Sequence, residues 1–228
     1  MAGSTRLVCV RHGRQIPTSA RTADNMRDPP LAEIGLQQAH DRAEQLRESL
    51  QGVAPVVVVS SPMLRALQTA APIAKAVGTA PLHSHGACFE FGCAGLEFGG
   101  GAAAVQQACP DATLSHFGPR GEWDYRGSSS KETEPEAKQR AGRVARWLQD
   151  ECLPQAEGGA VVLVAHATFL DLLLQLLVDG TDAGWEYGAA KFAFGHAGTR
   201  TIAATLGGAC AAGFTFAEVP ARCPTDIR

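Results

Sequence analysis

The sequence has little net charge, no paired cysteine motif and no long uninterrupted apolar segment. Its formal charge is -3 over 228 residues, so the charge balance gives no reason to expect nucleic acid or an anionic membrane as a partner. Hydrophobic residues make up 45% and charged residues 19% of the chain, which is ordinary for a globular protein with a sizeable core. We therefore expect neither a nucleic-acid partner nor a membrane partner.

The seven cysteines are odd in number, scattered, and form no C-x-x-C pair. This argues against the disulfide framework of a small secreted domain and favours a reducing compartment. The first apolar run, at 7–10, is too short for the core of a secretory signal. The longest apolar region, 160–178, contains His166 and other polar residues, which favours a buried strand and helix over a membrane span. The sequence thus predicts a cytoplasmic protein.

Strand-like and helical patterns alternate along the chain. Continuously apolar runs at 7–10, 56–60 and 160–165 are typical of strands covered on both faces, and two more strand-like runs follow at 200–205 and 213–219. Two helical faces lie between them, one made of Leu36, Ala39, Ala43, Leu46 and Leu50, the other of Ala137, Ala141, Val144, Ala145 and Leu148. We predict an α/β fold with a mainly parallel central sheet and helices on both faces, in one domain over residues 1–228.

Capping residues predict three helix starts. Ser61 precedes Pro62 as in a capped first turn, Thr133 and Glu136 have the spacing of a capping box, and Thr168 precedes a strongly apolar run.

Residues 86–131 lack a regular period and are rich in glycine, serine and aromatic side chains. The segment is too long for a simple connection, and its aromatic residues argue against disorder throughout. We interpret it as an irregular cap inserted over the active site.

Polar side chains follow three of the predicted strands. Arg11, His12 and Gly13 end the first, Arg65 lies shortly after the second, and His166 ends the strand at 160–165. In an open parallel sheet, ligands bind beyond the carboxyl ends of the strands, so these residues are expected to meet at one edge. Arginine matches phosphate oxygens with a fork of donors, and a neutral imidazole can attack phosphorus. This set predicts phosphate chemistry, with His12 as the better candidate for the nucleophile.

The same segments resemble the histidine phosphatase (phosphoglycerate mutase-like) superfamily. The motifs, in the order of the family, are R-H-G at 11–13, D-P-P-L-A-E-I-G-L-Q-Q-A at 28–39, S-P-M-L-R-A-L-Q-T-A at 61–70, E-T-E-P-E-A-K-Q-R-A-G-R-V at 132–144 and V-A-H-A-T-F-L at 164–170. Each piece is weak alone, but five in sequence are specific, and they point to the phosphatase branch.

The resemblance implies a role for each site residue. It makes His12 the phosphorylated nucleophile and places Arg11, Arg65 and His166 around the phosphate. The family's proton donor is a glutamate in a glycine-containing segment, and E-F-G-C-A-G-L-E-F at 90–98 offers two. Glu90 is the better match to the donor, and Glu97 is the alternative.

Some residues depart from the family pattern. Arg14 and Gln15 replace the acidic or small hydroxyl residues that often follow R-H-G, Thr18 stands where the mutases have asparagine, and Ala32 stands where a threonine usually caps the first helix. No catalytic residue is lost. Arg14 and Thr18 are expected to contact the substrate, and they leave its identity open. His196 lies near the site or in a turn, and the sequence does not decide between the two.

No metal or cofactor is expected. His83, His85, Cys88 and Cys93 are admissible zinc ligands, but their spacing matches no common site. The glycines at 99–101 are not followed by the G-K-S/T of a phosphate-binding loop, so a turn is the better interpretation.

Three functions follow from these residues. The favoured one is a phosphomonoesterase of the histidine acid phosphatase type, acting through phosphohistidine on a small phosphorylated substrate, with a phosphopeptide as an alternative. The second is a phosphoglycerate mutase, although the F-x-G-W-x-D motif of mutases is replaced by S-A-R-T-A-D-N-M-R-D-P-P-L at 19–31. The third is a non-catalytic module that binds a phosphorylated ligand. The oligomeric state is left open.

Overall fold

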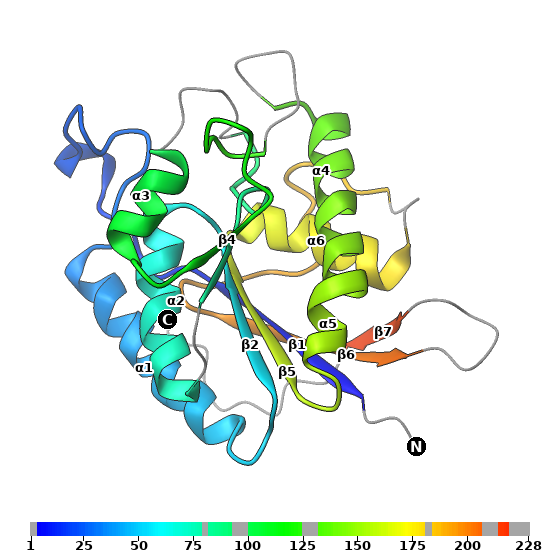
Figure 1. Ribbon diagram of the computed structural model, residues 1–228. Helices are drawn as coiled ribbons and strands as arrows, with labels where there is room; N and C mark the ends of the chain where they lie inside the picture. Colours follow the sequence, from blue (N-terminus) through cyan, green and yellow to red (C-terminus); the bar gives the residue numbers. More distant parts are fainter. Residues whose placement is uncertain are drawn as a thin grey trace.

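The computed structural model describes residues 4–78, 82–92, 100–124, 132–180, 184–206 and 214–218. These residues contain a seven-stranded sheet in the order β4-β3-β2-β5-β1-β6-β7, with helices on both faces (Figure 1). The strands are β1 (Thr5–Arg11), β2 (Val56–Ser60), β3 (His83–His85), β4 (Thr113–Ser115), β5 (Ala160–Ala165), β6 (Thr199–Leu206) and β7 (Phe214–Glu218). β6 pairs antiparallel with β1 and with β7, whereas the other pairings are parallel. The predicted α/β class and mainly parallel sheet are confirmed.

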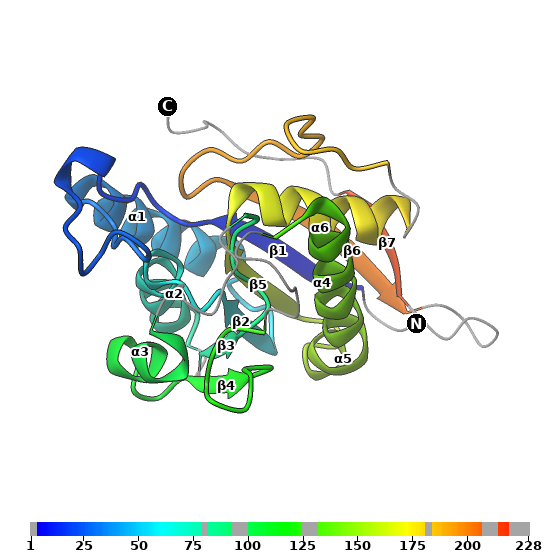
Figure 2. The same cartoon turned by 90° about the horizontal axis from the view of Figure 1, so that it is seen from above.

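The helices form two layers, which are visible on opposite sides of the sheet in Figure 2. One layer contains α1 (Glu33–Ser49), α2 (Leu64–Val77) and α3 (Gly101–Ala108). The other contains α4 (Glu134–Trp147), a π-helical turn (Leu148–Cys152), the short α5 (Leu153–Gln155) and α6 (Ala167–Asp179). None of the helices that the structure describes is long and apolar enough to cross a membrane.

The central strands divide their side chains between two apolar cores. Leu7 of β1 and Leu163 of β5 pack in the core on the α4 and α6 side, while Val8 and Val162 pack in the core on the α1 and α2 side. Successive side chains of a strand point to opposite faces, so both faces of these apolar runs are buried. Full burial of each such side chain is worth about 1.5–3 kcal/mol, and this makes the middle of the sheet a rigid support for its carboxyl edge.

The predicted helix starts are only partly right. The capping box of Thr133 and Glu136 at the start of α4 is confirmed. The other two predictions are wrong: α2 begins after Met63 rather than at Ser61, and the N-cap of α6 is His166 rather than Thr168. The cap of α2 thus lies further from its strand than predicted, and the Ser61 hydroxyl contacts His166 across the sheet edge instead (2.7 Å). The cap of α6 lies closer to its strand than predicted.

Part of the segment at 86–131 is regular. Its described residues include α3, and they include β4, which pairs with β3 and extends the sheet. A turn was expected at 99–101. Gly99 lies outside the described residues, Gly100 is the N-cap of α3, and Gly101 is the first residue of that helix. Strands of three residues and a helix of eight are too short to give a periodic signal, and this explains why the sequence did not predict them.

Candidate active site

Three strand ends meet at the carboxyl edge of the sheet, as predicted. The N–H of His12 donates to the carbonyl of Ala165 (3.0 Å), and the N–H of Ser61 donates to the carbonyl of Val164 (2.9 Å). Gly13 passes so close to α1 that a methyl group in place of its hydrogen would lie 2.5 Å from the carbonyl oxygen of Gly35. Glycine is therefore needed after His12 for close packing.

The hydrogen bonds of His12 define its tautomer. Its Nδ1 lies 2.6 Å from the carbonyl oxygen of Gly13, which can only accept, so Nδ1 carries the proton. The Nε of Arg65 donates to Nε2 of His12 (3.2 Å), which must therefore carry the lone pair. Burial and the positive charges of Arg65 and Arg11 hold the pKa of His12 well below its usual value. A neutral imidazole with its lone pair on Nε2 is the form that can act as a nucleophile.

His166 is fully buried next to His12. The two ring centroids lie 5.1 Å apart, and Nε2 of His166 lies 2.7 Å from the hydroxyl oxygen of Ser61. That hydroxyl also accepts the N–H of Met63 (3.2 Å), so its own proton is available to His166. Nδ1 of His166 has no hydrogen-bond partner among the described residues, and burial followed by the charge of Arg65 lowers the pKa of the ring. The neutral ring can therefore donate from Nδ1 to a bound oxyanion.

The two arginines are held by different neighbours. Nη1 of Arg11 donates to the carbonyl of Phe194 (2.8 Å), while its buried Nε has no hydrogen-bond partner in the described part of the chain. Arg65 is buried, and its Nη1 lies 3.8 Å from a carboxylate oxygen of Asp28, which also accepts the N–H of Leu64 (3.0 Å). Asp28 was not among the predicted site residues, and its only signal in the sequence was its place in the D-P-P-L segment.

Glu90 lies at the same edge, between its own loop and α6. One carboxylate oxygen accepts the N–H of Phe91 (2.8 Å) and the N–H of Phe169 in the first turn of α6 (3.0 Å). Burial raises the pKa of the carboxyl, and the two backbone hydrogen bonds and the charge of Arg65 oppose this only in part. A raised pKa favours the protonated form of the acid, which is the form that a proton donor needs. Glu97 lies outside the described residues.

The remaining candidates are more peripheral. Arg14 is exposed, and Thr18 is exposed in a short 3-10 turn (Thr18–Ala20). His196, whose place the sequence left open, lies with its ring centroid 6.2 Å from that of His12. Burial and the charges of Arg11 and Arg14 lower the pKa of His196. This histidine belongs to the surroundings of the site.

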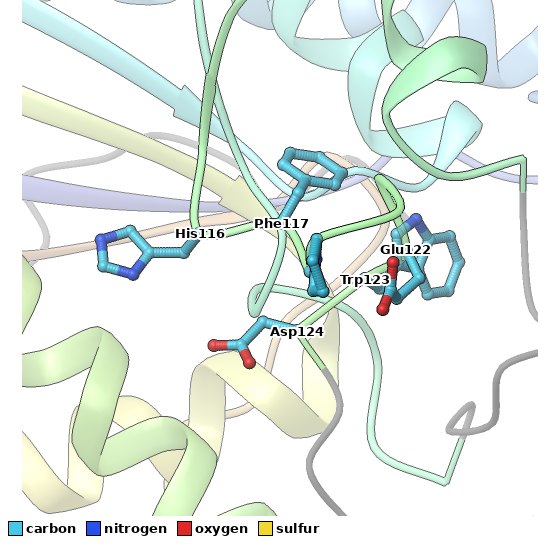
Figure 3. Close-up of a pocket in the computed structure, with 7 residues that line it drawn as sticks. His116, Phe117, Glu122, Trp123 and Asp124 are labelled. Atoms are coloured by element: carbon cyan, nitrogen blue, oxygen red, sulfur yellow. The ribbon is translucent and has the colours of Figure 1, made fainter.

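A separate pocket of about 350 Å³ lies beside the loop that carries Glu90. Figure 3 shows it between the end of β4 and the returning chain, with Phe117 and Trp123 among its walls. Trp123 stacks on Phe89, and the N–H of Asp124 donates to the carbonyl of Gly86 (3.1 Å). The residues lining it are His116, Phe117, Gly118, Pro119, Glu122, Trp123 and Asp124. The pocket therefore lies outside the cluster around His12.

No group of three or more potential metal ligands comes together in the described residues. Of the four residues considered for zinc, His83, His85 and Cys88 are described, and Cys93 lies outside the described residues. Nδ1 of His85 accepts the N–H of Ala87 (3.1 Å), so this ring supports the loop that carries Glu90.

A comparison of the sequence with known protein families agrees with the fold and with the residues clustered at the sheet edge. The model of the histidine phosphatase superfamily (branch 1) matches residues 7–193, and the chain therefore belongs to this superfamily. Among curated proteins, a probable phosphoglycerate mutase GpmB of Yersinia pestis is 42% identical over 69 residues. The match spans 30% of this chain and 30% of that protein, so it is local.

Solved structures with the same fold cover nearly the whole chain. The ecdysone phosphate phosphatase of Bombix mori, in complex with tungstate, has a TM-score of 0.66 at 18% identity and covers 98% of this chain and 95% of that one. A mycobacterial glucosyl-3-phosphoglycerate phosphatase in complex with VO3 has a TM-score of 0.58 at 23% identity, covering 94% and 97%. At these identities the likeness shows the shared fold.

Proposed function

We propose that the protein is a phosphomonoesterase that works through a phosphohistidine on Nε2 of His12. The observation that carries this proposal is the state of the His12 ring, with Nδ1 donating to a carbonyl and Nε2 facing the buried guanidinium of Arg65. An arginine that contacts the lone pair of the nucleophile is close enough to bind the oxygens of the phosphoryl group that the nucleophile attacks.

In the first step Nε2 of His12 attacks phosphorus, and the bond from phosphorus to the ester oxygen breaks as the bond to nitrogen forms. Protonated Glu90 gives its proton to the departing alcohol. Arg11, Arg65 and His166 bind the phosphoryl oxygens and stabilise the charge of the transition state. In the second step Glu90, now a carboxylate, takes a proton from water as the water attacks phosphorus. The bond from phosphorus to Nε2 of His12 breaks, its electron pair returns to the ring, and inorganic phosphate leaves.

The comparisons support a phosphate pocket. The two phosphatases named above are described as complexes with tungstate and with VO3, which are oxyanions like phosphate. The substrate class is a small phosphorylated molecule, with a phosphopeptide as the alternative. Arg14 and Thr18, and with them His196, are proposed to contact the part of the substrate beyond the phosphate. The segment at 86–131 is proposed to cap the site within a single domain.

A second candidate is a phosphoglycerate mutase, because the local match is to proteins with that name. A mutase needs a bisphosphorylated primer to charge its histidine, whereas a phosphatase turns over without one. The replacement of the F-x-G-W-x-D motif by the segment at 19–31 favours the phosphatase. Phosphoglycerate mutase activity that depends on the primer, with no hydrolysis of monoesters, would select the mutase.

The experiment is a hydrolysis assay with p-nitrophenyl phosphate and a panel of phosphorylated metabolites, with no primer added. Wild type is expected to release phosphate, and His12→Ala is expected to lose turnover because it removes the Nε2 that attacks phosphorus. His40→Ala, at an exposed histidine of α1, is the matched control and is expected to keep wild-type activity. Full activity in His12→Ala would refute the proposal.

A further inference from the structure

A buried ion pair lies behind the candidate proton donor. Arg140 of α4 donates from Nε to one carboxylate oxygen of Glu132 and from Nη2 to the other, both at 2.6 Å. The side chains of Arg140 and Glu132 are 1% and 0% exposed. Such a pair is expensive to desolvate, and well-packed apolar residues of similar size often stabilise a protein as well or better. Its presence points to a purpose other than stability.

The third donor of Arg140 holds the loop that leads to Glu90. Nη1 donates to the carbonyl of Ala87 (2.7 Å) and to the carbonyl of Phe89 (2.9 Å). The guanidinium lies over the ring of Phe89, 3.7 Å from its centroid. Arg140 therefore fixes both the backbone and the side chain of Phe89, the residue directly before Glu90.

The same guanidinium also contacts the helix α6, which donates a hydrogen bond to Glu90. It lies 4.8 Å from the ring centroid of Phe169, and the N–H of Phe169 donates to Glu90 (3.0 Å). Arg140 thus joins the loop carrying Glu90 to the helix that donates to its carboxylate. Glu132 fixes the guanidinium plane, because its two oxygens accept from two different nitrogens.

We propose that Arg140, oriented by Glu132, is a positioning residue for Glu90: it sets the place of the donor carboxyl against the leaving oxygen and touches neither substrate nor phosphate. This inference rests on the proposed function and adds to it a residue pair remote from the phosphate. Its signature is a defect that depends on the leaving group, since an alcohol must receive a proton to depart, whereas p-nitrophenolate leaves as a stable anion.

The experiment measures kcat/KM for an alkyl phosphate and for p-nitrophenyl phosphate in wild type, Glu90→Gln and the double variant Arg140→Met with Glu132→Leu. The double variant removes both charges, so no unpaired charge is left in the core, and we expect it to fold. General acid catalysis is worth about 10²–10⁴-fold, and we expect the alkyl activity of the double variant to fall at least about ten-fold more than the aryl activity. Val144→Ala, a cavity in the same helix, is the control for lowered stability, and it is expected to leave the alkyl-to-aryl ratio at the wild-type value.

Combining the double variant with Glu90→Gln separates positioning from a general loss of structure. If Arg140 acts through Glu90, the combination has the same alkyl-to-aryl ratio as Glu90→Gln alone. Equal loss on both substrates in the folded double variant, with unequal loss in Glu90→Gln, would overturn the inference and leave the proposed function standing. Absence of hydrolysis in wild type would overturn the proposed function, and the inference with it.

Discussion

At the scale of single residues, the partner of each ring nitrogen determines what a histidine can do. Nδ1 of His12 donates to a carbonyl, which leaves the lone pair on the nitrogen that faces Arg65. His85 is equally buried, but its Nδ1 accepts a backbone N–H and its ring packs against His116 and Trp147. The first ring therefore keeps a lone pair on Nε2 beside Arg65, while the second supports the loop that carries Glu90.

The shape of the Arg65 guanidinium can be tested at this scale. Arg65→Lys keeps the positive charge but loses the fork of donors, so it cannot face His12 and a phosphoryl group together. Loss of one such donor typically costs about 10²–10³-fold, and we expect kcat/KM for p-nitrophenyl phosphate to fall by roughly 10²-fold. Arg47→Lys, at an exposed arginine paired with Glu44, is the control and should be unaffected. Wild-type activity in Arg65→Lys would place the phosphate elsewhere.

At the scale of elements, the start of α4 is important because Arg140 and Glu132 lie in and next to this helix. Thr133→Ala removes the capping box and is expected to lower the free energy of unfolding by about 1 kcal/mol, measured by urea denaturation. Ser49→Ala is the control, since its hydroxyl makes only a 3.3 Å bond at the last turn of α1. An equal effect of the two substitutions would contradict the assigned cap.

The secondary-structure elements also show which parts of the fold and the site could be predicted from sequence. β1, β2 and β5 were predicted because each is a continuous apolar run, and their polar ends located His12, Arg65 and His166. Ser61 was misread as a helix cap, because its actual partner, His166, is distant in sequence. Contacts between residues distant in sequence, such as this one and those of Arg140 and Asp28, exist only in the folded chain, so no local sequence pattern predicts them. Leu36 was assigned to the buried face of α1, but it is 41% exposed, because the buried face runs through Gly35, Ala39, Ala43 and Leu46, and Leu36 lies outside it.

At the scale of the whole molecule, the buried histidines link stability to pH. Burial lowers the pKa of His85 to about 3, and it lowers the pKa of His12 and His166 as well. In the unfolded chain these rings bind protons near pH 6.5, so the unfolded state takes up more protons as the pH falls. The stability that their neutral forms contribute is therefore complete above about pH 6.5 and is lost below it.

We expect the free energy of unfolding to fall between about pH 7.5 and pH 5.5, by up to about 1.4 kcal/mol per pH unit for each of the three histidines. Glu90, whose pKa burial raises, acts in the opposite direction, because its folded form holds the proton more tightly than the unfolded chain does. Urea denaturation at several pH values measures how steeply the free energy of unfolding depends on pH. His85→Gln should make this dependence shallower by the contribution of one histidine. A stability that is constant or rises over this range would contradict the buried neutral state.

The most direct test of the central claim is acid-labile phosphoenzyme. Wild type mixed with a phosphorylated substrate and quenched under alkaline denaturing conditions should carry one phosphoryl group, and peptide mass analysis should locate it on His12. A quench in acid should remove it, because phosphohistidine hydrolyses there, and Glu90→Gln should accumulate more of it if hydrolysis of the intermediate needs the carboxylate. Turnover with no phosphoenzyme at any quench time, or phosphate on a residue other than His12, would contradict the mechanism.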